Sequence, residues 1–261
     1  MNTTFDLSRP FDFTGATAVV LGGATGLGLA MAEGLAAHGA SVCIASRSDE
    51  RARTAAATLA ERFGTPCHGC AADAASEDAV NRLRDHVANL FDDRVNIAID
   101  SAGINVRNPI DQISLGEFEA IQRINITGAF LFARAMHPLL RAASWGRLIN
   151  VASILASRSL PFRTSYAASK GAMLQLTRTL AFEWAAEKIT VNAISPGWFV
   201  TDMTRPVVDN PETYRQFCAK IPMERFAEPH EIVTACLFLA SPASSFVTGA
   251  EIVVDGGWMV T

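Results

Sequence analysis

The stretch TAVVLGGATGLG, residues 17–28, decides the fold. Residues 17–21 form a short apolar run, glycines follow, and residues 26–38 are expected to form a helix that Gly39 ends. Glycines in such a turn let the backbone approach a pyrophosphate closely, and the free N–H groups of the helix start attract the anion. The alternative is a purely structural Gly-rich turn. We predict a dinucleotide-binding loop made by Gly22, Thr25, Gly26, Leu27 and Gly28.

Apolar runs and helical stretches alternate along the rest of the chain. Further strands are expected at residues 41–46, 67–72, 97–100, 147–153, 189–195 and 251–255, with a helix at 49–63 that Gly64 ends. Mostly continuous apolar strands separated by helices predict an α/β protein with a doubly wound parallel sheet of about seven strands and helices on both faces. Residues 1–261 are expected to form a single domain, whose ligands bind beyond the carboxyl ends of the strands.

Composition excludes several other classes of protein. The 261 residues are 49% hydrophobic and 18% charged with a net charge of -4, which fits a folded chain and gives no basic footprint for nucleic acid. The sequence has no run of about 18 apolar residues, so no membrane span is predicted. Residues 1–9 lack the apolar core of a signal peptide. Five cysteines, an odd number, favour a reducing, cytoplasmic location.

A Cys-x-x-Cys pair, Cys67 and Cys70, surrounds His68. No second ligand pair follows at the spacing of a zinc site, so we expect small apolar residues near a strand there and no metal. The loop at residues 22–28 also lacks the Lys-Ser/Thr pair of ATP-binding loops, which excludes the simplest ATPase.

The end of the second strand predicts which nicotinamide cofactor binds. Proteins that prefer NAD usually carry an acid there for the ribose 2′-hydroxyl, whereas this chain has Ser46, Arg47 and Ser48. Hydroxyls beside a guanidinium suit a 2′-phosphate, so NADP(H) is favoured over NAD(H). The alternative is that Arg47 is an ordinary solvated arginine.

A candidate catalytic group follows the fifth strand. Tyr166 and Lys170 are four residues apart at a predicted helix start and therefore share one face, and Ser153 ends the strand before them. A free phenol is too weak an acid to work readily at neutral pH, and a nearby ammonium favours the phenolate. The Ser153 hydroxyl would donate to a substrate oxygen as negative charge develops.

Together these residues resemble the short-chain dehydrogenase/reductase family over essentially the whole chain, which implies a Rossmann-like fold. The resemblance places an active-site asparagine, which holds a relay water, at Asn125. It further implies cofactor contacts, which lie after the third, fourth and sixth strands: Asp73, Ala74, Ser101, Ala102, Gly103, Pro196, Gly197, Phe199 and Thr201, beside Tyr166 and Lys170. Two positions depart from the family pattern, with Leu21 in place of a threonine and Asp100-Ser101 in place of Asn-Asn.

Substrate contacts are predicted by position only. The candidates surround the predicted carboxyl ends of the strands: Asn105, Arg107, Ser153, Leu155, Arg158, Phe162, Arg163 and Trp198. The arginines suggest an acidic substrate, although surface solvation or a subunit contact is an equal alternative. Residues 198–225 are expected to form a substrate lid.

Within the family, residues 102–107 and 254–258 resemble sugar and sugar-acid dehydrogenases of the gluconate 5-dehydrogenase type. A 3-oxoacyl-thioester reductase acting on an acyl carrier protein is the close rival, and it would need a basic patch at the cleft mouth. A protein that senses NADP(H) without catalysis is a remote alternative, since such proteins typically lack the tyrosine or the lysine. The resemblance also implies a homotetramer, built on residues 130–140 and 172–186, with a second contact at 258–260.

Overall fold

The computed structural model describes residues 8–261, so the polar start at residues 1–7 lies outside the described part of the chain. Seven parallel strands form one sheet in the order β3-β2-β1-β4-β5-β6-β7. Their bounds are β1 Thr17–Leu21, β2 Ser41–Ser46, β3 Cys67–Ala71, β4 Ile97–Asp100, β5 Gly146–Val151, β6 Ile189–Pro196 and β7 Glu251–Val254. This arrangement confirms the predicted doubly wound sheet, and the strand ends differ from the expected ones by no more than two residues.

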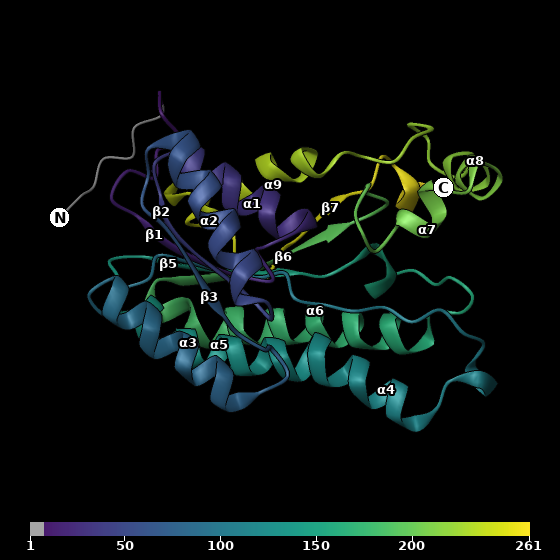
Figure 1. Ribbon diagram of the computed structural model, residues 1–261, viewed down its shortest axis with the longest axis horizontal. Helices are drawn as coiled ribbons and strands as arrows, with labels where there is room; N and C mark the ends of the chain where they lie inside the picture. The colour runs from purple at the N-terminus through teal and green to yellow at the C-terminus, as the bar shows by residue number, and fades with distance from the viewer. Residues whose placement is uncertain (1–7) are drawn as a thin grey trace.

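Helices cover both faces of the sheet (Figure 1). On one face lie α1 (Gly26–Ala37), α2 (Asp49–Phe63) and α9 (Val233–Ala240), and on the other lie α3 (Glu77–Leu90), α5 (Gly128–Ala142) and α6 (Thr164–Trp184). Alternate residues of β2 serve the two cores: Val42 and Ile44 pack toward α1, while Cys43 and Ala45 pack toward α3. Because both faces are covered, the strands are continuously apolar instead of alternating with polar residues.

Local signals explain where the helices begin and end. The Ser48 hydroxyl caps α2 by accepting a hydrogen bond from the Arg51 N–H, and Gly64 ends that helix with a left-handed φ of 69°. α4 (Leu115–Gln122) begins with a capping box formed by Ser114 and Glu117. It continues through a π turn, Arg123–Thr127, into α5, and π turns frequently occur at functional sites.

The segment after β6 forms two short helices, α7 (Arg205–Val208) and α8 (Pro211–Cys218). They lie at one end of the molecule near the C-terminus (Figure 1). Trp198 is buried against α8 and the following loop, stacking on Phe226 and meeting Phe217 edge-on. Among the described residues, no helix combines the length and apolarity that crossing a bilayer requires.

Candidate active site

The Gly-rich loop lies between β1 and α1, and steric space explains its glycines. A Cβ on Gly22 would lie 2.8 Å from the Ala102 N atom, and one on Gly28 would lie 2.2 Å from the Gly22 carbonyl oxygen. Gly22 and Gly26 also have φ values of 77° and 54°, which side chains disfavour. The loop therefore folds tightly and presents backbone at the start of α1, as a pyrophosphate site requires.

A hollow at the carboxyl ends of β1, β2, β3 and β4 extends from this loop. Its lining brings together the residues predicted for the adenosine half of a dinucleotide: Gly22, Thr25, Ser46, Arg47, Ser48, Asp73, Ala74, Ser101, Ala102 and Gly103. Arg51 also lines it, from the first turn of α2. The sequence did not single out Arg51, because Arg47 precedes the helix and the spacing of the two arginines is therefore not that of one helix face.

A second hollow adjoins the first and shares Gly22, Thr25, Ser101 and Gly103 with it. It is lined by further predicted cofactor and catalytic residues: Gly26, Leu27, Ser153, Tyr166, Lys170, Pro196, Gly197, Phe199 and Thr201. Asp202, Met203 and Thr204 line it as well and were not predicted. Two of the predicted cofactor and catalytic residues, Gly28 and Asn125, line neither hollow. Because the two hollows share part of their lining, they form one continuous cleft, and its Gly-rich loop, helix start and strand ends fit a dinucleotide.

Tyr166 and Ser153 meet where β5 ends and α6 begins. Both side chains are buried, and the Ser153 hydroxyl accepts a hydrogen bond from the Leu155 N–H at 3.1 Å. Burial raises the pKa of Tyr166, while hydrogen bonding to Ser153 and the positive charge of Arg163 act in the opposite direction. The structure thus gives Arg163 a part that the sequence analysis gave to Lys170 alone.

Lys170 is 3% exposed and has its ammonium group at 5.8 Å from the centre of the Tyr166 ring. Its Nζ donates a hydrogen bond to the Val151 carbonyl at 2.7 Å. Burial lowers the pKa of Lys170 to about 8, and the charge of Asp100 opposes that shift. The ammonium therefore remains mostly protonated at neutral pH and is held beside the cleft by the end of β5.

Asn125 lies in the π turn and is fully buried. Its Nδ2 donates to the Ile104 carbonyl at 3.0 Å and to Ser169 Oγ at 3.0 Å, and its Oδ1 accepts from the Ile104 N–H at 2.9 Å. The amide thereby fixes the loop after β4 to α6. Its predicted part in a water relay stays a prediction.

Asp100, where the sequence departs from the family pattern, is 1% exposed at the end of β4. Its Oδ1 accepts a hydrogen bond from the Ala102 N–H at 3.1 Å, and its Oδ2 has no hydrogen-bond partner among residues 8–261. Burial raises the pKa of Asp100 to about 6, against the lowering effects of Lys170 and the Ala102 N–H. The other departure, Leu21, is buried and lines the adenosine end of the cleft.

Some of the predicted substrate residues are buried near Tyr166, and others are exposed. Arg163 is 7% exposed and lies close enough to Arg107 for the two charges to repel, and Arg107 donates to the Met203 carbonyl at 3.3 Å. Leu155 packs directly against Tyr166, whereas Arg158 is exposed and donates to the Met259 carbonyl. Phe162 is 54% exposed with a φ of 64°.

Two predicted substrate residues carry unpaired polar atoms. Asn105 Oδ1 and Trp198 Nε1 are buried, and neither has a hydrogen-bond partner in the described part of the chain. Buried polar atoms are normally paired, so unpaired ones are candidates to bind a ligand. Neither residue lines either hollow, and their part in substrate binding stays a prediction.

Known proteins resemble this chain along nearly its whole length. A family model described as Enoyl-(Acyl carrier protein) reductase matches residues 22–259. The chain belongs to the short-chain dehydrogenase/reductase family. It is therefore an oxidoreductase that acts on CH–OH or C=O groups.

Two curated relatives represent the two substrate classes raised by the sequence. Gluconate 5-dehydrogenase of Gluconobacter oxydans is 32% identical, over 98% of this chain and 100% of its own. The 3-oxoacyl-(acyl-carrier-protein) reductase of Aquifex aeolicus is 33% identical, over 93% of this chain and 97% of its own. A solved gluconate 5-dehydrogenase of Burkholderia cenocepacia, in complex with NADP and tartrate, is 32% identical with a TM-score of 0.92, over 97% of this chain and 98% of its own.

The buried carboxyl of Asp100 predicts a pH-dependent gain in stability for Asp100→Asn. The folded pKa of about 6 exceeds the ordinary value of 3.8, so the folded chain binds this proton more tightly and loses stability as pH rises between those values. Asparagine has no such loss. We expect equal unfolding free energies near pH 4 and a gain on the order of 3 kcal/mol for the variant near pH 7, measured by urea denaturation. A gain that is the same at both pH values would contradict the assignment.

Proposed function

We propose that this enzyme transfers a hydride between NADP(H) and a secondary alcohol or ketone, with a sugar acid or polyol as the substrate. The observation that carries the proposal is the meeting of Tyr166, Ser153 and Lys170 in the same cleft as the Gly-rich loop. When bound, the nicotinamide supplies or accepts the hydride. In reduction the Tyr166 hydroxyl gives its proton to the carbonyl oxygen, and in oxidation the phenolate takes the alcohol proton.

The other residues position the reacting groups and stabilise the charge that develops on them. Ser153 donates a hydrogen bond to the substrate oxygen, where charge develops. Lys170, anchored by the Val151 carbonyl, supplies positive charge beside the phenol. It would also help to hold the cofactor through a hydroxyl when the cofactor is bound. Asn125 holds the loop after β4 and orders the water that returns protons to Tyr166.

NADP(H) is proposed over NAD(H) because the rim of the adenosine hollow is basic. Ser46 ends β2 in place of an acid, and both Arg47 and Arg51 line the hollow. Arg47 and Arg51 have no ion-pair partner in the described part of the chain, whereas the neighbouring Arg53 binds Asp49 at 2.6 Å. Two unpaired guanidinium groups suit a 2′-phosphate with charge-assisted hydrogen bonds.

This assignment predicts that Arg47→Ala and Arg51→Ala each raise the KM for NADPH about tenfold or more, the loss of one charge-assisted hydrogen bond. The KM for NADH stays unchanged because that cofactor has no 2′-phosphate. Steady-state kinetics with both cofactors provide the measurement, and Arg53→Ala is the matched control, since that arginine is paired with Asp49. Equal effects on both cofactors would show that the arginines do not bind the 2′-phosphate.

An acidic substrate is proposed because Arg163 is a buried cation beside the reacting phenol. Burial lowers the pKa of Arg163 to about 10, and the nearby Arg107 adds to that shift. Neither arginine has a carboxylate partner within the described residues, so a carboxylate of the substrate would supply the missing counter-charge. A buried arginine favours a small anion over a carrier protein, which would be bound by exposed arginines at the cleft mouth.

The loop and helices of residues 198–225 are proposed as the lid over this substrate. The segment meets the cleft at Met203, whose carbonyl accepts a hydrogen bond from Arg107. Trp198, at its start, carries the unpaired Nε1. The predicted homotetramer and cytoplasmic location stay predictions. Phe130 on α5 and Phe182 on α6 are 46% and 89% exposed, which supports an apolar contact on that layer.

A substrate panel tests the proposal. We expect NADPH consumption, followed by its absorbance, to have its highest kcat/KM with a keto-sugar acid, lower values with the matching neutral keto-sugar, and the lowest with an acetoacetyl thioester. Arg163→Gln lowers kcat/KM for both sugars, because the charge beside Tyr166 is lost, and the loss for the acid exceeds that for the neutral sugar by about 10- to 100-fold. Arg158→Gln is the control, because that side chain is directed to the Met259 carbonyl.

Two outcomes would contradict this substrate class. Preference for the acetoacetyl thioester, with Arg163→Gln without effect, favours the 3-oxoacyl-thioester reductase. Tight NADPH binding with no turnover of any panel member favours a sensing protein.

A further inference from the structure

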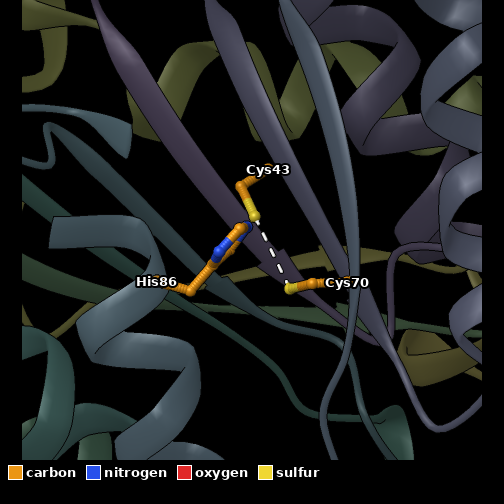
Figure 2. Close-up of side chains that lie close together, drawn as sticks. All are labelled: Cys43, Cys70 and His86. Carbon is orange, nitrogen blue, oxygen red and sulfur yellow. Dashed lines mark hydrogen bonds between the residues drawn. The ribbon is translucent and has the colours of Figure 1, made fainter. Parts of the chain in front are cut away.

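Three side chains with metal-binding chemistry meet beneath α3, away from the catalytic cleft. Cys43 comes from β2, Cys70 from β3 and His86 from α3, and Figure 2 shows the imidazole of His86 beside the two sulfur atoms. One nitrogen or sulfur atom from each residue lies within 4.8 Å of the others, and the two sulfurs are 3.9 Å apart. All of the cysteines in the described part of the chain are free thiols.

The register of the parallel sheet creates this group. Cys43 is opposite His68 and Ala45 is opposite Cys70, so both sulfurs point to the face that α3 covers. The same pleat separates Cys67 from Cys70, because residues three apart in a strand point to opposite faces. Cys67 packs into the core under α1 and α2. The Cys-x-x-Cys pair therefore forms no site of its own, and the real partner of Cys70 comes from a different strand.

The distances suit a tetrahedral thiophilic ion. Zinc–sulfur bonds of about 2.3 Å at the tetrahedral angle place two sulfurs about 3.8 Å apart, close to the 3.9 Å between Cys43 and Cys70. The corresponding sulfur–nitrogen separation is about 3.6 Å, which small side-chain rotations reach from the present spacing. Two thiolates and one imidazole form a Cys₂His donor set, which zinc uses with water as the fourth ligand.

The site is open to solvent on one side, although Cys43 itself is buried. His86 is exposed and Cys70 half-buried, so an ion can enter from solvent along the edge strand.

We propose that Cys43, Cys70 and His86 bind one thiophilic divalent ion, Zn²⁺, with water as the remaining ligand. Binding displaces two thiol protons into solvent and leaves the imidazole neutral, so charge and atoms balance. This revises the expectation, drawn from Cys67 and Cys70, that the chain has no metal site. The inference does not depend on the proposed function.

An ion at this site would link three elements of the fold. β3 is an edge strand that, within the part of the chain that the structure describes, pairs with β2 alone, and the ion would join β2, β3 and α3. Cys43 precedes Ser46 by three residues, and Cys70 precedes Asp73 by three. The ion would therefore brace the strands that carry the adenosine end of the cleft, from behind.

Titration of the reduced, full-length protein with Cd²⁺ and Zn²⁺ tests the proposal, with a non-thiol reductant present. We expect one Cd²⁺ per chain, a near-ultraviolet thiolate-to-metal absorbance, and its displacement by Zn²⁺. Zn²⁺ at about 100-fold its Kd raises the Tm by about 5 °C or more. Cys70→Ser and His86→Gln each lower the affinity for the metal at least about tenfold. Because the side chain of His86 is exposed, we expect His86→Gln to fold even if the buried substitution Cys43→Ser prevents folding.

Cys67→Ser is the matched control, since it lies on the same edge strand but on the opposite face. It keeps the wild-type absorbance and Tm shift. The proposal is overturned if wild-type protein shows no thiolate-to-metal absorbance, if Cys67→Ser abolishes it, or if Cys70→Ser and His86→Gln bind as tightly as wild type. NADPH turnover plays no part in these readouts, so failure of the proposed reaction leaves them interpretable.

Discussion

The parallel register of the sheet is the constraint on which the site depends. Leu21 is aligned with Ala45 on one side and with Asp100 on the other, and Asp100 is aligned with Asn150. Since all seven strands run the same way, the loops that follow them leave the sheet along one edge. The Gly-rich loop, the loop after β4 and the start of α6 meet there, although they are far apart in the sequence.

Buried charge is the second feature that shapes the cleft. Asp100, Lys170 and Arg163 are all buried, and none has a direct ion-pair partner in the described part of the chain. Burial destabilises the charged form of each, so their charges persist only through longer-range attraction and hydrogen bonds. Such destabilised groups are common where a ligand completes the charge balance. Two of them, Lys170 and Arg163, place positive charge around the phenol of Tyr166.

Much of this molecule could be predicted from the sequence, because strand and helix signals are local. The run at residues 17–21, the glycines after it and the helix stop at Gly64 each lie where expected. All of the predicted cofactor residues except Gly28 line one cleft, because the loops at strand ends are fixed by topology. Contacts between residues far apart in the sequence could not be predicted, because they depend on how the elements pack. Examples are the hydrogen bond from Lys170 to the Val151 carbonyl, the position of Arg163 beside Tyr166 and that of Cys70 beside Cys43.

The most direct test of the central claim is single-turnover reduction of a keto substrate by Tyr166→Phe loaded with NADPH. The account predicts NADPH affinity within about threefold of wild type and a hydride-transfer rate reduced by about 100-fold or more, the typical share of a proton donor. Fluorescence of bound NADPH reports both quantities in one experiment. A hydride-transfer rate near that of wild type would contradict the account, because the phenol would then not be the group that moves the proton.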